Sequence, residues 1–167
     1  MNFPISMKNQ TNETHAFLTF SLGAEQFAIS VDSVQEIVEL EQVTKVPNAP
    51  QYMLGIINLR GKVLPLLDTR LKLGLSKAEI TKRSRIMVIE LETTDDKNLQ
   101  VGALVDVAKE VIELSSADIQ RSLDFENYET DAPITGIVNN HGNITMIMDV
   151  TKIFSTAEIV QLNHSLN

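Results

Sequence analysis

An internal repeat constrains this chain more than any other feature. Residues 31–40 match residues 105–114 at five of ten positions, and residues 55–68 match residues 136–149 at five of fourteen positions. A repeat of this kind indicates one supersecondary unit used twice, and the two copies should pack together because each alone buries too little surface. The offsets between matching segments are 74 and 81 residues, so the second copy has the longer connection between its two segments.

Each copy follows the same plan of a hairpin, an apolar segment with acidic residues, and a second hairpin that starts at glycine. Short apolar runs separated by turn residues favour β-strands, and the helical signals are brief. We expect about five strands per copy, and a curled five-stranded sheet removes its exposed edges. The sequence therefore predicts a mainly all-β chain with two five-stranded β-barrels, short helices and a C-terminal helix. The expected hairpins pair residues 17–22 with 26–29, 55–59 with 62–67, 85–91 with 99–105, and 136–139 with 144–148.

The chain divides into a tail, one domain and a terminal helix. The polar, aperiodic residues 1–14 are expected to form a disordered tail. Residues 15–156 are expected to form one domain of two closely packed barrel subdomains, built from repeat segments at about 17–73 and 85–154. The pattern leaves open whether the copies exchange strands. Residues 157–167 are expected to form a terminal helix and tail, because a capping-box spacing precedes them.

Charge and composition exclude several classes of partner. The formal net charge is −8, whereas nucleic-acid and anionic membrane surfaces are bound mainly through Lys and Arg. The chain contains no cysteine, so it has no disulfide framework and no thiolate chemistry. No apolar run approaches the roughly 20 residues of a membrane span, and the start lacks the apolar stretch of a signal peptide. We therefore expect a cytoplasmic protein that neither binds nucleic acid nor inserts into a membrane.

Two aspartates at the ends of the repeated hairpins suggest one catalytic hypothesis. Asp68 and Asp149 each follow an apolar strand, as in an aspartic-type hydrolase, where two carboxylates from related lobes share a proton. Arg70 stands where that chemistry needs a glycine, and the second copy continues differently. The favoured interpretation is that each aspartate caps the turn or short helix after its strand.

No other catalytic or metal-binding set is evident in the sequence. The histidines are His15, His141 and His164, and no two of them have the spacing of metal ligands. The sequence contains no glycine-rich phosphate loop and no common nucleophile motif. We therefore expect no enzyme activity, no metal and no cofactor.

The two copies differ at the tip of the glycine-initiated hairpin. Arg60 in the first copy corresponds to His141 in the second, and each precedes a glycine that the turn requires. Arg60 is therefore either a solvated charge that pairs with Glu36 or Glu39, or an anchor for a protein partner, since arginine is enriched at interface hot spots. Apolar residues on the neighbouring strand must also face partly outward and would add an interaction patch: Val34, Ile37 and Val38.

Five strings of residues together carry a resemblance to a known family. They are residues 34–37 (VQEI), 43–50 (VTKVPNAP), 55–61 (GIINLRG) and 65–68 (PLLD) in the first copy, and 101–106 (VGALVD) in the second. These strings closely resemble the CheW family, and the most specific is Asn-Leu-Arg-Gly followed by Val-x-Pro-x-x-Asp. The resemblance extends over nearly all of the expected fold.

The resemblance implies two SH3-like barrels in a non-catalytic adaptor for bacterial chemotaxis. Such an adaptor couples the cytoplasmic tips of methyl-accepting chemoreceptors to the regulatory domain of the histidine kinase CheA, and the helical tip is expected in the groove between the barrels. Location at membrane-associated receptor arrays, with self-association in array rings, is implied as well. Family members also serve type IV pilus or second-messenger pathways, an alternative that the sequence leaves open. The interface residues carried over by motif position are Val34, Glu36 and Arg60, with Ile37 and Asn58 beside them, and Leu104, Val105 and Asp106 near the groove or a kinase contact.

Overall fold

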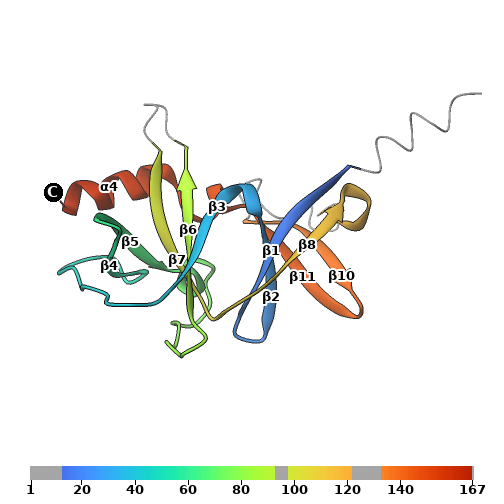
Figure 1. Cartoon of the computed structure of the whole chain (residues 1–167), viewed down its shortest axis with the longest axis horizontal. Coiled ribbons are helices and arrows are strands. Elements are labelled where there is room, and N and C mark those ends of the chain that lie inside the picture. The colour runs from blue at the N-terminus through green and yellow to red at the C-terminus, as the bar shows by residue number, and fades with distance from the viewer. Residues whose placement is uncertain (1–12, 93–97, 122–132, 167) are drawn as a thin grey trace, which may run out of the picture.

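Two lobes lie side by side, and each is built around one β-sheet (Figure 1). The structure, a computed structural model, describes residues 13–92, 98–121 and 133–166, so the expected tail lies outside the described residues up to residue 12. The strands are β1 (Thr14–Leu22), β2 (Glu25–Ser30), β3 (Val34–Glu39), β4 (Met53–Leu59), β5 (Lys62–Asp68), β6 (Arg85–Leu91), β7 (Leu99–Val105), β8 (Val107–Ser115), β9 (Gln120–Arg121), β10 (Ile134–Asn140) and β11 (Asn143–Met148). The helices are the 3-10 turns η1 (Val31–Ser33) and η2 (Ser116–Asp118), and α2 (Thr69–Lys72), α3 (Val150–Ile153) and α4 (Thr156–Leu166).

The two sheets have matching strand orders. We call the lobe of residues 34–105 the central barrel, and its sheet has the order β3-β6-β7-β5-β4. We call the lobe of residues 14–30 and 107–148 the terminal barrel, and its sheet has the order β8-β1-β2-β11-β10-β9. The prediction of a mainly β chain with two related sheets and short helices is confirmed. The terminal sheet has six strands because the two-residue strand β9 adds to its edge.

The two copies of the repeat exchange their first hairpins. β1 and β2 belong to the first copy, but they pair with β8 and β11 of the second copy. In the same way, β6 and β7 belong to the second copy and pair with β3 and β5 of the first. Only three residues separate β2 from β3, and only Asp106 separates β7 from β8, so each chain segment continues into the other barrel instead of folding back. Each barrel thus combines the hairpin of one copy with the other strands of the other copy.

The glycine that starts each repeated hairpin is required by a close crossing of the chain. A Cβ atom on Gly55 would lie 2.3 Å from the carbonyl oxygen of Thr44, at a φ angle of 152°. A Cβ atom on Gly136 would lie 2.5 Å from Cγ2 of Ile119, immediately before β9. Both distances are shorter than a van der Waals contact. Gly55 is therefore required by the backbone of the crossing segment, and Gly136 by the side chain of Ile119.

Each repeated hairpin ends in an aspartate that caps a short helix, as predicted. The carboxylate of Asp68 accepts the N–H groups of Arg70 and Leu71 in α2 at 3.0 and 3.3 Å, and that of Ala78 at 2.9 Å. Asp149 is only half-buried, and its Oδ1 accepts from the N–H and hydroxyl of Thr151 at 3.0 and 2.6 Å. Both aspartates therefore satisfy helix N–H groups that would otherwise lack a partner.

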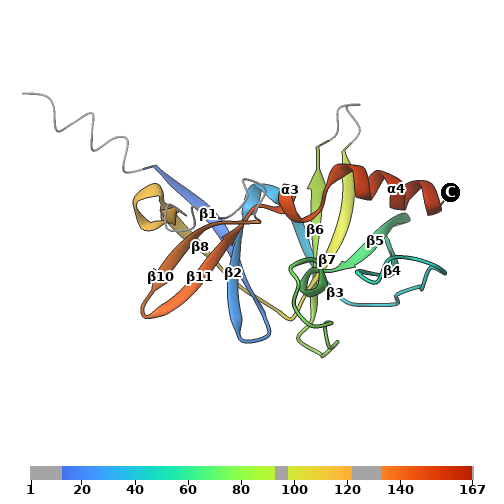
Figure 2. The same ribbon diagram turned by 180° about the vertical axis from the view of Figure 1, so that it is seen from behind.

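One hydrophobic core fills the space between the barrels. It joins Phe20 of the terminal barrel to Met87 of the central barrel, so the two lobes are packed as one unit. The predicted terminal helix is α4, which follows the second copy in sequence but lies across the central barrel, as Figure 2 shows from behind. Ile159 of α4 is fully buried, and Glu158 accepts a 2.7 Å bond from Nζ of Lys72 on α2. Within the described residues, no helix is both long and apolar enough to cross a bilayer.

Candidate functional site

Glu36 and Arg60 form an ion pair across the seam of the central barrel. Glu36 lies on β3 and Arg60 follows β4, and these strands are the two edges of the central sheet. Nη1 and Nη2 of Arg60 donate to Oε1 and Oε2 of Glu36 at 2.8 and 2.7 Å. These hydrogen bonds, together with the negative charge of Glu36, raise the pKa of Arg60 above its usual value. The Arg60 side chain is still 74% exposed, so a partner can reach the paired guanidinium.

The turn that carries Arg60 has an uncommon backbone geometry. Arg60 and Gly61 have φ angles of 52° and 84°, and two positive φ angles define the type I′ turn of a tight hairpin. His141 has a φ angle of 53° at the same place in the second copy. Asn58 supports the turn, because its Oδ1 accepts the N–H of Gly61 at 2.9 Å. Asparagine adopts this left-handed conformation more readily than arginine does, so the turn itself does not require an arginine at position 60.

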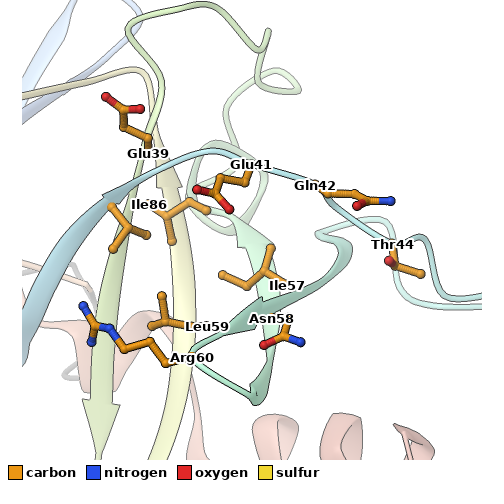
Figure 3. Close-up of a pocket in the computed structure, with 10 residues that line it drawn as sticks. Glu39, Glu41, Gln42, Thr44, Ile57, Asn58, Leu59, Arg60 and Ile86 are labelled. Atoms are coloured by element: carbon orange, nitrogen blue, oxygen red, sulfur yellow. The ribbon is translucent and has the colours of Figure 1, made fainter.

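A cavity of ≈ 580 Å³ opens beside the ion pair, between β3 and β4 (Figure 3). Ile57 and Ile86 form part of its apolar lining and are themselves buried. Its polar residues come from the end of β3, the connection to β4 and the hairpin tip. The complete lining is Val38, Glu39, Glu41, Gln42, Thr44, Ile57, Asn58, Leu59, Arg60 and Ile86. This cavity lies in the seam of one barrel, whereas the contact between the two barrels is filled by the shared core.

The remaining residues predicted on β3 have different environments. Ile37 is 40% exposed on the outer side of the strand. Val34 is half-buried and packs against the shared core. Glu36 pairs with Val88, which is buried inside the central barrel, so its carboxylate lies on the inner side of the wall. The structure thus brings Glu36, Arg60 and Asn58 together at the seam, with Ile37 on the adjoining outer surface.

The three residues predicted near the end of β7 are not part of this surface. Leu104 and Val105 are 1% and 0% exposed, so in this structure a partner cannot touch them. Asp106 lies between the barrels, and its Oδ2 accepts from the N–H of Gly23 at 2.6 Å and from Nη1 of Arg70 at 3.0 Å. Gly23 belongs to the terminal barrel and Arg70 to α2, so Asp106 links the two lobes.

The structure offers no support for a shared-proton pair of aspartates. The hydrogen bonds described for Asp68 and Asp149 tie each carboxylate to its own capped helix, and Asp68 also accepts the N–H of Ala78. Across residues 13–92, 98–121 and 133–166, no group of three or more acidic or histidine side chains is placed to hold a metal ion. His15 and His141 are exposed, and the side chain of His164 lies outside the described ones.

The sequence pattern missed the part of the cavity that the connection between β3 and β4 forms. Glu41, Gln42 and Thr44 lie in the connection between β3 and β4. This connection has no strand periodicity, and its only predictive feature is the resemblance of residues 43–50 to the CheW family. A local signal did exist, because a glycine inside a strand, such as Gly55 in β4, often marks a close approach by another segment. The sequence could not indicate that the crossing segment begins at residue 40.

Comparison with known proteins identifies the family and agrees with the fold. A family model described as the CheW-like domain matches residues 16–158. Among the curated relatives, the chemotaxis protein CheW of Rhizobium meliloti is 32% identical over 151 residues, covering 90% of this chain and 94% of the relative. The chemotaxis protein CheW of Bacillus subtilis is 32% identical over 136 residues, with coverage of 81% and 84%.

A solved structure gives the same result in three dimensions. The crystal structure of the scaffolding protein TtCheW from Thermoanaerobacter tengcongensis superposes with a TM-score of 0.73 at 28% sequence identity. The match covers 86% of this chain and 90% of that one, so it includes both barrels. The chain therefore belongs to the CheW-like domain family, as a non-catalytic adaptor of bacterial chemotaxis built from two SH3-like barrels.

Proposed function

We propose that this adaptor couples the cytoplasmic tips of methyl-accepting chemoreceptors to the regulatory domain of the histidine kinase CheA. It would do so in the cytoplasm, where it is recruited to receptor arrays at the membrane. The adaptor changes no bond in its partners; its task is to hold receptor and kinase in a fixed relative geometry. The packing of both barrels on one core suits that task, because a rigid spacer transmits a displacement that a flexible one would absorb.

The observation that carries the proposal is the presentation of Arg60. A left-handed backbone disfavours residues other than glycine, asparagine and aspartate, yet this position holds an arginine. Its guanidinium is fixed by two hydrogen bonds to Glu36 and is still largely exposed. A planar cation held in one orientation loses little conformational entropy on binding, which favours its use as an interface anchor.

The surroundings of Arg60 suit a protein partner. Ile37 is 40% exposed, and Val63 on the adjoining hairpin is 51% exposed. Protein interfaces are enriched in arginine, and their buried centres are more apolar than the rest of the surface. We assign the partner-binding surface to Val34, Glu36, Ile37, Asn58 and Arg60. Leu104 and Val105 would support it through packing, and Asp106 would set the angle between the barrels.

Equivalent surfaces on the two barrels support assembly into rings. By the repeat, Val111 corresponds to Ile37 and Ile144 corresponds to Val63. Val111 and Ile144 are 58% and 59% exposed, so both barrels expose apolar residues at matching places. An adaptor with a binding surface on each barrel can contact two neighbours, and we propose that it associates with the kinase and with further copies in array rings.

The proposal is tested with purified components. The full chain is titrated with a chemoreceptor cytoplasmic fragment and, separately, with the CheA regulatory domain, by calorimetry and by co-sedimentation. We expect each partner to bind, and Arg60→Ala to weaken at least one interaction by roughly tenfold, or about 1.4 kcal/mol. His141→Ala is the matched control, because it alters the same turn position in the terminal barrel. If neither partner binds the unmodified chain, the proposed function is wrong.

A further inference from the structure

The backbone of the seam contains a strand edge without a partner. Ile56 of β4 forms two hydrogen bonds with Thr44, its N–H to the Thr44 oxygen at 2.8 Å and its C=O to the Thr44 N–H at 2.9 Å. In an antiparallel ladder, alternate residues direct both backbone groups to the same edge. The N–H and C=O of Asn58, two residues later, therefore face the edge on which Thr44 lies.

The neighbouring segment leaves that edge before it reaches Asn58. Continuing the antiparallel register from Thr44 would place Gln42 opposite Asn58, but no hydrogen bond joins the backbones of these two residues. Both residues instead line the cavity (Figure 3), so the cavity begins where the ladder stops. The β4 edge at Asn58 is consequently an exposed donor and acceptor pair at the wall of a preformed cavity.

The charges at the rim of this cavity are mainly acidic. The Glu39 side chain is 80% exposed, and its nearest cation, Arg85, is 3.9 Å away. Glu41 is exposed as well and forms no ion pair with a described residue. Arg60 is the one cation among the lining residues, and Glu36 already balances it. The rim therefore attracts a positive side chain and repels a negative one.

We infer that this cavity binds a short extended segment of a partner protein, which adds to the β4 edge at Asn58 and places a Lys or Arg side chain between Glu39 and Glu41. A helix cannot take this place, because its backbone groups are already bonded within the helix. The inference rests on the proposed function and refines it. Of the two proposed partners, the CheA regulatory domain would supply the strand and bind at the seam. The helical receptor tip would bind elsewhere on the adaptor.

Amide hydrogen exchange of the full chain, followed by NMR, tests the backbone contact. The Asn58 amide should exchange freely in the isolated protein and at least about tenfold more slowly when the CheA regulatory domain is bound. The amide of Asn139, at the same position of the terminal barrel, is the internal reference. Three results overturn the inference while the proposed function stands: the complex leaves exchange of the Asn58 amide unchanged, it slows both amides equally, or the Asn58 amide is already protected in the free chain.

Charge reversal tests the basic residue. The double variant Glu39→Lys, Glu41→Lys should weaken binding of the same domain by about tenfold at low salt and less at high salt. Glu113→Lys is the control for a single reversal outside the cavity, because Glu113 is the repeat equivalent of Glu39 and is also exposed. Equal affinities of the double variant and the control would exclude a cation in the cavity. Failure of the unmodified chain to bind at all would instead contradict the proposed function, and this inference with it.

Discussion

Replacing Asp68 by alanine measures how strongly the corner after β5 is held. The side chain is fully buried, and its two oxygens accept three backbone N–H groups. Loss of the helix cap costs about 1–2 kcal/mol, and the N–H of Ala78, left without its charged acceptor, adds about 1–2 kcal/mol. We therefore expect Asp68→Ala to lower the free energy of unfolding by about 3 kcal/mol.

Asp149→Ala is the matched comparison, since both aspartates end the same hairpin of the repeat. The half-buried Asp149 accepts one backbone N–H, so its loss should cost about 1 kcal/mol. At about 2–4 °C per kcal/mol for a chain of this size, the midpoint should fall by about 6–12 °C for Asp68→Ala and about 2–4 °C for Asp149→Ala. Urea unfolding followed by circular dichroism provides the free energies directly.

The comparison has a clear negative outcome. If the two variants lose the same stability, or if Asp68→Ala loses less than Asp149→Ala, then burial and the third N–H contribute nothing and the reasoning fails. Asp68→Asn refines the result, because an amide has only one acceptor oxygen. If that oxygen accepts the helix N–H groups, the NH₂ group faces the N–H of Ala78; in the opposite orientation the NH₂ group faces the helix N–H groups. That variant should therefore also be destabilised, with a cost set mainly by the lost Ala78 bond.

Three further predictions follow from the same structure. Arg60→Asn suits the left-handed turn, so it should leave the midpoint of thermal unfolding unchanged or slightly higher. Its binding to the receptor fragment or the CheA domain should weaken as in Arg60→Ala. A parallel loss of folding would show that Arg60 is structural. Gly55→Ala should cost about 3 kcal/mol because its Cβ atom meets the chain, whereas Gly61→Ala, with nothing within 4 Å, should cost about 1 kcal/mol in urea unfolding. Burial and the charge of Glu158 raise the pKa of Tyr52 above 10.0, so the unfolded chain loses this proton first. The stability that Tyr52 contributes is therefore complete below pH 10 and lost as the pH rises further; a Tyr52→Phe variant with an identical alkaline stability profile would contradict this.

The candidate site could be predicted in part. Arg60 stands out because the two copies differ at its position, whereas Glu36 is predicted only by its motif position in the resembled family. The structure joins the two residues by two hydrogen bonds. Leu104 and Val105 came from motif position alone, which says nothing about the face of a strand, and both are buried. Glu41 and Gln42 could not be predicted, because their place at the cavity depends on where an irregular connection leaves the β4 edge.

The elements themselves follow from local chemistry in the sequence. Alternating apolar runs, glycines at turns and aspartates after strands act over a few residues, and they determined the hairpins, the capped helices and the two-copy plan. Only the tertiary structure decided which copy each hairpin joins. Both copies present equivalent strand edges, so pairing preference alone cannot choose between them; the short links after β2 and β7 and the core between the barrels make that choice. The ion pair across the seam exists for the same reason, since it needs β3 and β4 as the two edges of one sheet.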